Sequence, residues 1–439
     1  MNTDLDHEIK QPKNSNPSAD SITSSSLFPG SRPRQLLEIF SVSAKLGFTS
    51  FGGPIAHLGY FHNEYVKSRK WLDEKNYAEL VALCQFLPGP ASSQVGIGIG
   101  LRRGGLLGAV AAWIGFTLPS AAAMTLFALT LRGSDISGAA WLHGLKLTAV
   151  AVVAHAVWSM GRKLAAGPSR AAIAVFAAAL TLLWPGAFGQ VAAIAAAALA
   201  GLWLYRREAD APPPPGSPSY EPATPAARPP LPALRRRGAA LSLALFAALL
   251  ILLPLIAQRF PQAGGGALPL IDSFYRAGSL VFGGGQVVLP LLQSEVVPPG
   301  WVGEPDFLAG YGFVQAMPGP LFTFAAYLGA VKDGLSGALI ATMAIFLPAF
   351  LLIVGALPFW SRLCRNANIQ RALQGVNAAV VGILLAALYD PVWTSSVRTA
   401  GDFLLALLLF AMLAWWKMPP WTTVLAGAAG GMLLPLLGA

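Results

Sequence analysis

An internal repeat constrains the fold of this chain more than any other feature of its sequence. Phe51-Gly52-Gly53 returns as Phe282-Gly283-Gly284 about 230 residues later. Gln85-Phe86-Leu87-Pro88-Gly89-Pro90 returns at nearly the same offset as Gln315-Ala316-Met317-Pro318-Gly319-Pro320. Motifs that recur in the same order indicate a duplicated unit. In an apolar chain, Gly/Pro-interrupted segments at matching places in two halves are the best sequence indication of a transport site.

The composition is typical of a membrane protein. Apolar residues make up 55% of the chain, charged residues 11%, and the mean hydropathy is +0.57. A soluble domain carries roughly 25% charged residues. Most stretches between polar breaks are roughly 18 to 25 residues long, which is enough for a helix to cross a bilayer. The apolar runs are continuous rather than alternating, which argues against a β-barrel.

The predicted fold class is an all-α polytopic membrane protein. It consists of two inverted-topology repeats with broken or re-entrant helices, and about 9–13 membrane segments in all. A Pro-rich stretch followed by three arginines separates the two copies, and one apolar segment after it has no counterpart in the first copy. The predicted parts are a disordered cytoplasmic tail (1–35), a first repeat (36–206), a Pro/Arg-rich cytoplasmic linker (207–238), an extra transmembrane helix (239–257) and a second repeat (258–439).

The charges of equivalent loops predict the inversion. Loop 62–76 carries four basic residues, whereas its counterpart 293–306 has no Lys or Arg and three acidic residues. Basic loops stay in the cytoplasm, so the two loops are expected on opposite faces. The single unmatched helix gives the odd number of crossings that such an inversion needs. Whether the broken segments cross the membrane fully or form re-entrant hairpins is left open by the sequence.

Each Pro-Gly-Pro triplet is expected to break a helix, because proline removes a backbone donor and clashes with the preceding turn. Broken backbone at membrane depth is tolerated only beside protein or a water-filled cavity. The half-helix that starts after the break points free N–H groups and a positive dipole end at an anion. The alternative is a pair of kinks that only shape packing. The predicted substrate-binding residues are Gly52, Gly53, Gln85, Pro88, Gly89, Pro90, Ser92, Ser93, Arg102, Gly283, Gly284, Gln315, Pro318, Gly319, Pro320, Thr323 and Lys332.

Other polar residues are candidates for attracting an anion or carrying protons. Arg102 and Lys332 recur at equivalent places. In one interpretation they attract a dianion to a vestibule, which is an entrance beside the site. In the other they are loop charges that only set the orientation of the helices in the membrane. The proton-coupling candidates, for which a solvated interfacial role is the alternative, are His57, Glu64, Glu79 and Glu295.

Several other functions lack support in the sequence. The net charge of +10 reflects basic loops beside apolar spans, and no basic-aromatic patch indicates nucleic-acid binding. No metalloprotease, phosphate-loop or nucleophile-elbow motif is present. Cys84 and Cys364 lack metal or redox spacing. The chain is therefore predicted not to be an enzyme, with no catalytic residue, metal site or cofactor.

The repeated motifs resemble the chromate ion transporter family, and the match covers nearly all of 36–439. The pattern in the first copy is Phe51-Gly52-Gly53-Pro54, Trp71-Leu72, Gln85 through Pro90, Arg102-Arg103-Gly104-Gly105 and Leu118-Pro119. The resemblance implies a long-chain, two-domain member in the bacterial inner membrane. It also implies export of chromate from the cytoplasm and chromate resistance, with coupling to the proton-motive force proposed. Pro54 departs from the second copy, which keeps Gly285, so the two copies are not expected to form equivalent sites.

The sequence leaves the identity of the substrate open. Chromate and sulfate are both tetrahedral dianions, and hydrogen bonds and dipoles hardly separate them. A sulfate or general oxyanion carrier is one alternative, and a membrane enzyme or scaffold that transports nothing is another. The expected partners are the oxyanion and the lipid bilayer, and a homodimer is left open.

Overall fold

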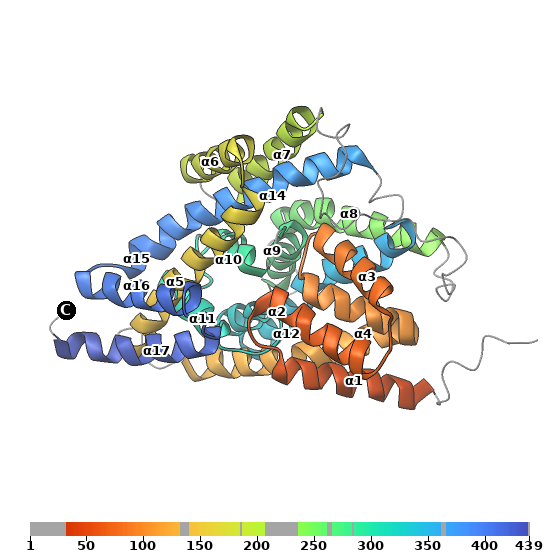
Figure 1. Ribbon diagram of the computed structural model, residues 1–439, viewed down its shortest axis with the longest axis horizontal. Helices are drawn as coiled ribbons and strands as arrows, with labels where there is room; N and C mark the ends of the chain where they lie inside the picture. The colour runs from red at the N-terminus through yellow and green to blue at the C-terminus, as the bar shows by residue number, and fades with distance from the viewer. Residues whose placement is uncertain are drawn as a thin grey trace, which may run out of the picture.

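Every regular element of the computed structural model is a helix, over the residues that the structure describes (Figure 1). This confirms the predicted all-α class. The described residues are 32–131, 140–184, 187–206, 236–260, 266–282, 285–360 and 366–437. Most of the predicted tail and linker, together with Gly283 and Gly284, therefore lies outside them, and the predicted domain boundaries stay predictions.

The two copies contain matching helices in the same order. The first comprises α1 (Arg32–Thr49), α2 (Gly53–Phe61), η1 (His62–Ser68), α3 (Glu74–Phe86), α4 (Ala91–Leu131), α5 (Ala140–Leu164), α6 (Pro168–Leu183) and α7 (Ala187–Leu204). The second comprises α9 (Ala267–Leu280), η5 (Gly285–Val287), α10 (Val288–Val296), α11 (Glu304–Val314), η6 (Leu321–Thr323), α12 (Phe324–Ala356), η7 (Leu357–Phe359), α14 (Ala367–Ala387), η8 (Leu388–Trp393), α15 (Thr394–Ser396), α16 (Ala400–Ala414), α17 (Pro420–Leu433) and η9 (Leu434–Leu437).

One further helix, α8 (Arg236–Arg259), lies between the copies where the extra segment was predicted. It packs against the second copy and is joined to it by two hydrogen bonds to main-chain carbonyls. Ser242 Oγ donates to the carbonyl of Leu351 at 2.8 Å, and Tyr275 Oη donates to the carbonyl of Phe246 at 3.0 Å. Most of its apolar side chains stay exposed, as expected of a helix that faces lipid.

The Pro-Gly-Pro break of the first copy is the tip of a hairpin. Gly89 adopts a φ of +112°, which glycine tolerates, and the chain reverses between α3 and α4. Arg102, late in the first part of α4, donates from Nη1 to Oδ1 of Asn76, early in α3, at 3.4 Å. Each arm is 13 residues or so, about 20 Å at 1.5 Å per residue. The segment is therefore re-entrant rather than fully spanning.

The second copy forms the same hairpin from α11 and the first part of α12. Gly319 adopts a φ of +91° at the tip. Near the open end, Tyr327 Oη donates to the carbonyl of Asp306 at 2.9 Å, and Lys332 Nζ lies 5.0 Å from the ring centroid of Trp301. The Pro-Gly-Pro tips of both copies thus end inside the protein.

A second sharp turn follows each hairpin. Gly105 and Gly334 have nearly the same dihedral angles, with φ of 64° and 65° and ψ of −154° and −145°. After the first turn α4 doubles back, so that a Cβ added at Gly100 would overlap the carbonyl oxygen of Gly108.

The two long helices run in opposite directions. Trp113 of α4 packs edge-on against Phe346 and Phe350 of α12, with centroids 5.8 and 5.6 Å apart. Further along α4, Phe127 stacks at 5.7 Å on Tyr327, close to the open end of the second hairpin. Phe127 lies 22 residues past the turn at Gly105, about 33 Å along a helix. The hairpins of the two copies therefore open on opposite faces, which is the predicted inversion.

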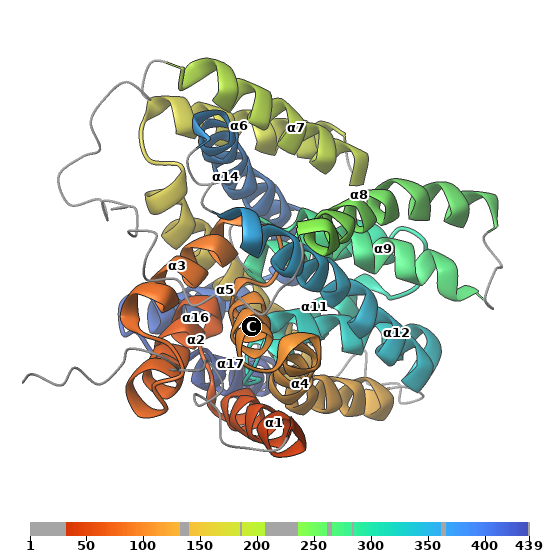
Figure 2. The same ribbon diagram turned by 90° about the vertical axis from the view of Figure 1, so that its right-hand side faces the viewer.

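The two copies exchange their last helices. In both views α6 and α7 lie beside α14 of the other copy, while α16 and α17 lie beside α5 (Figures 1 and 2). Glycines allow the close approach: a Cβ on Gly144 would overlap the carbonyl oxygen of Gly427, and one on Gly375 would overlap that of Ala197. The exchange joins the copies into one body.

Five helical stretches among the described residues are long and apolar enough to span a membrane. They are Ala91–Leu131, Ala140–Leu164, Arg237–Arg259, Leu321–Phe359 and Ala367–Ser396. Shorter apolar helices at Pro168–Leu183, Gly189–Leu204 and Ala400–Ala414 pack beside them.

Cysteine accessibility tests the inversion. Both native cysteines are replaced, and single cysteines are introduced at the exposed Lys67 and Pro299. In right-side-out vesicles, a membrane-impermeant maleimide should label Pro299→Cys, and Lys67→Cys only after permeabilisation. Equal labelling of both positions without permeabilisation would contradict the inversion.

Two glycines of α5 test the helix exchange. Gly144→Ala should lower the thermal unfolding temperature of the detergent-purified protein, because overpacking a tight contact typically costs about 1–3 kcal/mol. Gly161→Ala is the control, since its added methyl meets only the Val381 side chain at 3.8 Å. Alanine is the better helix former by about 1 kcal/mol, so the control should be neutral or stabilising. Equal unfolding temperatures for the two variants would count against the packing described.

Candidate functional site

Reciprocal hydrogen bonds join the breaks of the two copies. The backbone N–H of Gly89 donates to the carbonyl of Val281 at 2.7 Å, and that of Gly319 donates to the carbonyl of Ser50 at 2.9 Å. Val281 and Ser50 occupy equivalent positions, directly before the two Phe-Gly-Gly motifs. Each Pro-Gly-Pro tip therefore meets the broken helix of the other copy. The two kinds of break thus meet between copies rather than within one copy.

The first break brings polar side chains together inside the protein. Ser92 lies in the first turn of α4, and its Oγ is 3.3 Å from Nδ1 of His57 in α2. Only 1% of His57 and 2% of Ser92 are exposed. His57 also packs edge-on against Phe116 with centroids 5.7 Å apart. The contact between Ser92 and His57 joins a predicted substrate-binding residue to a predicted proton-coupling residue.

Ser93 and Gln94 add hydrogen-bonding capacity to the same turn. Gln94 Nε2 donates to the carbonyl of Pro88 at 2.8 Å and so braces the tip. The hydroxyl of Ser93 is buried and makes no hydrogen bond to the described residues. A buried donor without a partner costs about 1–3 kcal/mol, so this hydroxyl is available to a ligand at little further cost.

The second break is not an equivalent site. The positions of His57, Ser92 and Gln94 are taken by Val288, Phe322 and Phe324. Thr323, the counterpart of Ser93, donates its hydroxyl to the carbonyl of Pro320 at 2.8 Å. The polar groups at the start of the half-helix thus belong to the first copy, as the Pro54/Gly285 difference suggested.

The remaining predicted residues of the breaks shape the backbone. Gly52 and Gly53 adopt φ of 96° and 81°, which lets α2 begin directly after α1 ends. Gln85 and Gln315 differ in spite of their equivalence. Gln85 is exposed, whereas Gln315 is buried and its Nε2 has no hydrogen-bond partner among the described residues.

The predicted cations lie away from the breaks. Arg102 is ten residues from Ser92, about 15 Å along the half-helix. Glu79 lies near enough to interact electrostatically with Arg102. In the second copy Lys332 forms an ion pair with Asp333 at 2.7 Å. These residues line the open ends of the hairpins, where they fit the vestibule or topology roles but do not reach the break.

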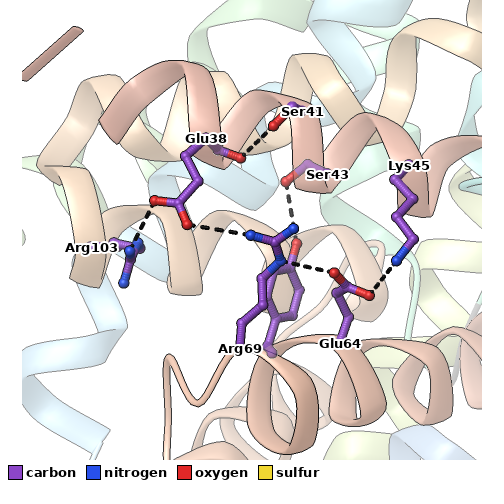
Figure 3. A network of polar contacts seen from close by, with 8 residues as sticks. Glu38, Ser41, Ser43, Lys45, Glu64, Arg69 and Arg103 are labelled. Carbon is purple, nitrogen blue, oxygen red and sulfur yellow. Dashed lines mark hydrogen bonds and ion pairs between the residues drawn. The ribbon is translucent and has the colours of Figure 1, made fainter. Parts of the chain in front are cut away.

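A charged network joins α1 to η1 and the loop after it, and to Arg103 of α4 (Figure 3). Glu64 Oε2 binds Lys45 Nζ at 2.7 Å and its Oε1 binds Arg69 Nε at 2.9 Å. Glu38 binds Arg69 at 3.3 Å and Arg103 at 3.0 Å. Burial opposes the charge of Glu64, but the hydrogen bonds from Lys45 and Arg69 outweigh it and lower its pKa. Glu64 is thus ionised at neutral pH, which makes it a poor proton carrier.

The equivalent carboxylate of the second copy has a different setting. Glu295 Oε2 binds Arg276 Nη2 at 2.8 Å, and Arg276 occupies the position of Lys45. Burial raises the pKa of Glu295 in spite of the neighbouring Arg276.

Comparison with known proteins decides the family. The model of the family described as "Chromate transporter" matches residues 37–202 and 268–432, one segment in each copy. The chain belongs to the chromate transporter family. The match thus extends to both copies of the repeat, and no solved structure matches this transporter.

Individual relatives agree with this membership. A "Chromate transport protein" of Pseudomonas aeruginosa is 29% identical, over 92% of this chain and 94% of its own length. A "Chromate transport protein" of Cupriavidus metallidurans is 28% identical, over 92% of this chain and 94% of its own length. An uncharacterized transporter of Bacillus subtilis is 29% identical over 38% of this chain and 97% of its own length, the size of one copy. Such relatives are named as transporters rather than enzymes, as predicted for this chain.

Sequence reasoning missed some polar residues of this transporter. Gln94 and Ser50 act through the backbone geometry of the tips, and only their place in the fold reveals it. The replacement of Gln94 by Phe324 in the second copy was a usable signal, because it shows that the first break is the polar one. Among the described residues, no group of three or more His, Cys, Asp or Glu side chains is arranged to hold a metal ion.

The low pKa of Glu64 predicts acid sensitivity. A carboxylate whose pKa is lowered on folding stabilises the protein at neutral pH and loses that effect as pH falls through the folded-state pKa, below its usual 4.5. The unfolding temperature of the wild type should therefore decrease as the pH falls through the folded-state pKa of Glu64. Glu64→Gln should unfold at a lower temperature at neutral pH and show a smaller acid drop. Parallel curves for the two proteins would contradict the network's role.

Proposed function

We propose that this protein is a secondary active transporter that exports chromate from the bacterial cytoplasm across the inner membrane, and so confers chromate resistance. Family membership and the named relatives support chromate as the substrate. The observation that carries the proposal is the buried polar half-helix start at the first break, where hydroxyls and free N–H groups lie together.

The start of α4 suits a tetrahedral dianion. The N–H groups of its first turn have no intrahelical partner, and the helix dipole is positive there. The hydroxyls of Ser92 and Ser93 add donors from the same turn. When His57 donates from Nδ1 to Ser92 Oγ, the proton of Ser92 stays free for an anion oxygen. Hydrogen bonds to a charged acceptor contribute about 1.5–3 kcal/mol each.

The membrane potential favours export of such an anion. Moving one elementary charge across 100 mV is worth about 2.3 kcal/mol, so a dianion leaving a negative interior gains about 4.6 kcal/mol. The reciprocal hydrogen bonds place the first break between the two inverted copies. Movement of one copy against the other would expose that point to each face in turn.

Chromate uptake into everted membrane vesicles tests the function. The wild type should accumulate chromate and retain most uptake in excess sulfate. Ser93→Ala should weaken apparent affinity about tenfold, since 1.4 kcal/mol is a factor of ten. Ser336→Ala is the control, because that exposed hydroxyl only bonds the carbonyl of Asp333 at 2.9 Å.

Other outcomes would overturn parts of the proposal. Uptake erased by sulfate would make the protein a general oxyanion carrier. No uptake of either anion would favour a membrane enzyme or scaffold. Equal affinities for Ser93→Ala and Ser336→Ala would remove the binding site from the first break.

A further inference from the structure

Two buried carboxylates of the second copy share one cation. Asp272 and Arg276 lie one turn apart on α9, and Arg276 Nη2 is 2.9 Å from Oδ2 of Asp272. The same nitrogen is 2.8 Å from Oε2 of Glu295 at the end of α10. Both carboxylate side chains are 8% exposed. The cluster therefore holds two buried acids beside one base whose side chain is 21% exposed.

The first copy balances its charges differently. There, two acids meet three bases in the network of Figure 3, with Glu64 and Lys45 at the positions of Glu295 and Arg276. Asp272 replaces Ser41 and Pro269 replaces Glu38, so the number of acids stays at two. In the alignment that pairs Arg102 with Lys332, Pro299 and Asp333 occupy the positions of Arg69 and Arg103, so two of the three bases are absent. The same ion pair thus sits in a surplus of positive charge in one copy and of negative charge in the other.

One oxygen of the cluster has no partner. Oδ1 of Asp272 is buried and accepts no hydrogen bond from the described residues. An ionised carboxylate oxygen left in this state is costly, whereas a protonated carboxyl is not. With one proton shared between the two carboxyls, the cluster is neutral, and without it the cluster carries one buried negative charge.

No other described charge compensates this negative charge. The elements packed on α9 are α8, α10 and α12, and their charged residues include Arg237, Arg259, Lys332 and Asp333. None of these four is among the groups that act on the two carboxylates, which are Arg276, Ser273 and the carboxylates themselves. Arg259 instead contacts the ring of Phe260, and Lys332 pairs with Asp333.

A single helix connects the cluster to the first break. Asp272 lies nine residues before Val281, about 14 Å along α9. The carbonyl of Val281 accepts the hydrogen bond from Gly89, next to the half-helix start. A Cβ added at Gly89 would lie 3.6 Å from the carbonyl oxygen of Gly278 on the same helix. A change of charge at Asp272 therefore acts on the helix that holds the tip.

We propose that Asp272 and Glu295 bind one exchangeable proton and form the site that couples anion export to proton entry. This proposal rests on the proposed function. The cluster lies toward the face opposite the basic loop 62–76. The positive-inside rule places that loop in the cytoplasm, so the cluster lies toward the outer face. A proton from outside would bind the pair, neutralise the cluster and leave to the cytoplasm during the cycle.

Transport by purified protein in liposomes separates coupling from anion binding. Asp272→Asn and Glu295→Gln should keep chromate counterflow, which is an exchange without net proton movement. Chromate accumulation driven by a pH gradient should fall at least tenfold in both variants. Glu64→Gln is the matched control, the same change at the equivalent position, and should retain gradient-driven accumulation. Absence of counterflow in the wild type would refute the proposed function, whereas gradient-driven accumulation by the two variants would refute the proton site alone.

Infrared spectroscopy provides a readout that does not depend on transport. The wild type should show a protonated-carboxyl carbonyl band at neutral pH that is lost in Asp272→Asn and Glu295→Gln and kept in Glu64→Gln. A spectrum unchanged by Asp272→Asn and Glu295→Gln would overturn the proposal, even if those variants failed to transport.

Discussion

The structure depends on the reciprocal hydrogen bonds between Gly89 and Val281 and between Gly319 and Ser50. A helix broken inside a membrane leaves backbone groups that lipid cannot satisfy. Here the donor freed at each Pro-Gly-Pro tip meets the acceptor freed where a helix of the other copy ends. Neither copy can satisfy its own break in this way. In this chain, each break is therefore satisfied by the other copy.

The same symmetry that joins the copies leaves them chemically unequal. Backbone geometry repeats closely, as the matching turns at Gly105 and Gly334 show. Side chains diverge: the first break is polar and the second apolar. Glu64 of the first copy lies in a surplus of positive charge, whereas its counterpart Glu295 lies in a surplus of negative charge. In the mechanism that we propose, the first copy binds the anion and the second responds to protons, with α9 linking the two.

Much of this architecture could be read from the sequence. The repeat, the membrane class, the extra helix and the inversion follow from motif order, hydropathy and loop charge, each of which acts locally or over one membrane span. The candidate residues at the breaks were found because proline and glycine have strong local effects. Arg102 and Lys332 were grouped with them because a cation recurs at equivalent places shortly after each break in the sequence. In the structure a half-helix separates them from the tips.

By itself the sequence determined that the chain forms two inverted, broken-helix copies, because apolar length, basic loops and Pro-Gly-Pro triplets act through local physics. The tertiary structure alone decided that the breaks are re-entrant tips and that each one pairs with the other copy. It also decided that Asp272 and Glu295 share Arg276. These features depend on contacts between residues far apart in the chain, which no local preference encodes.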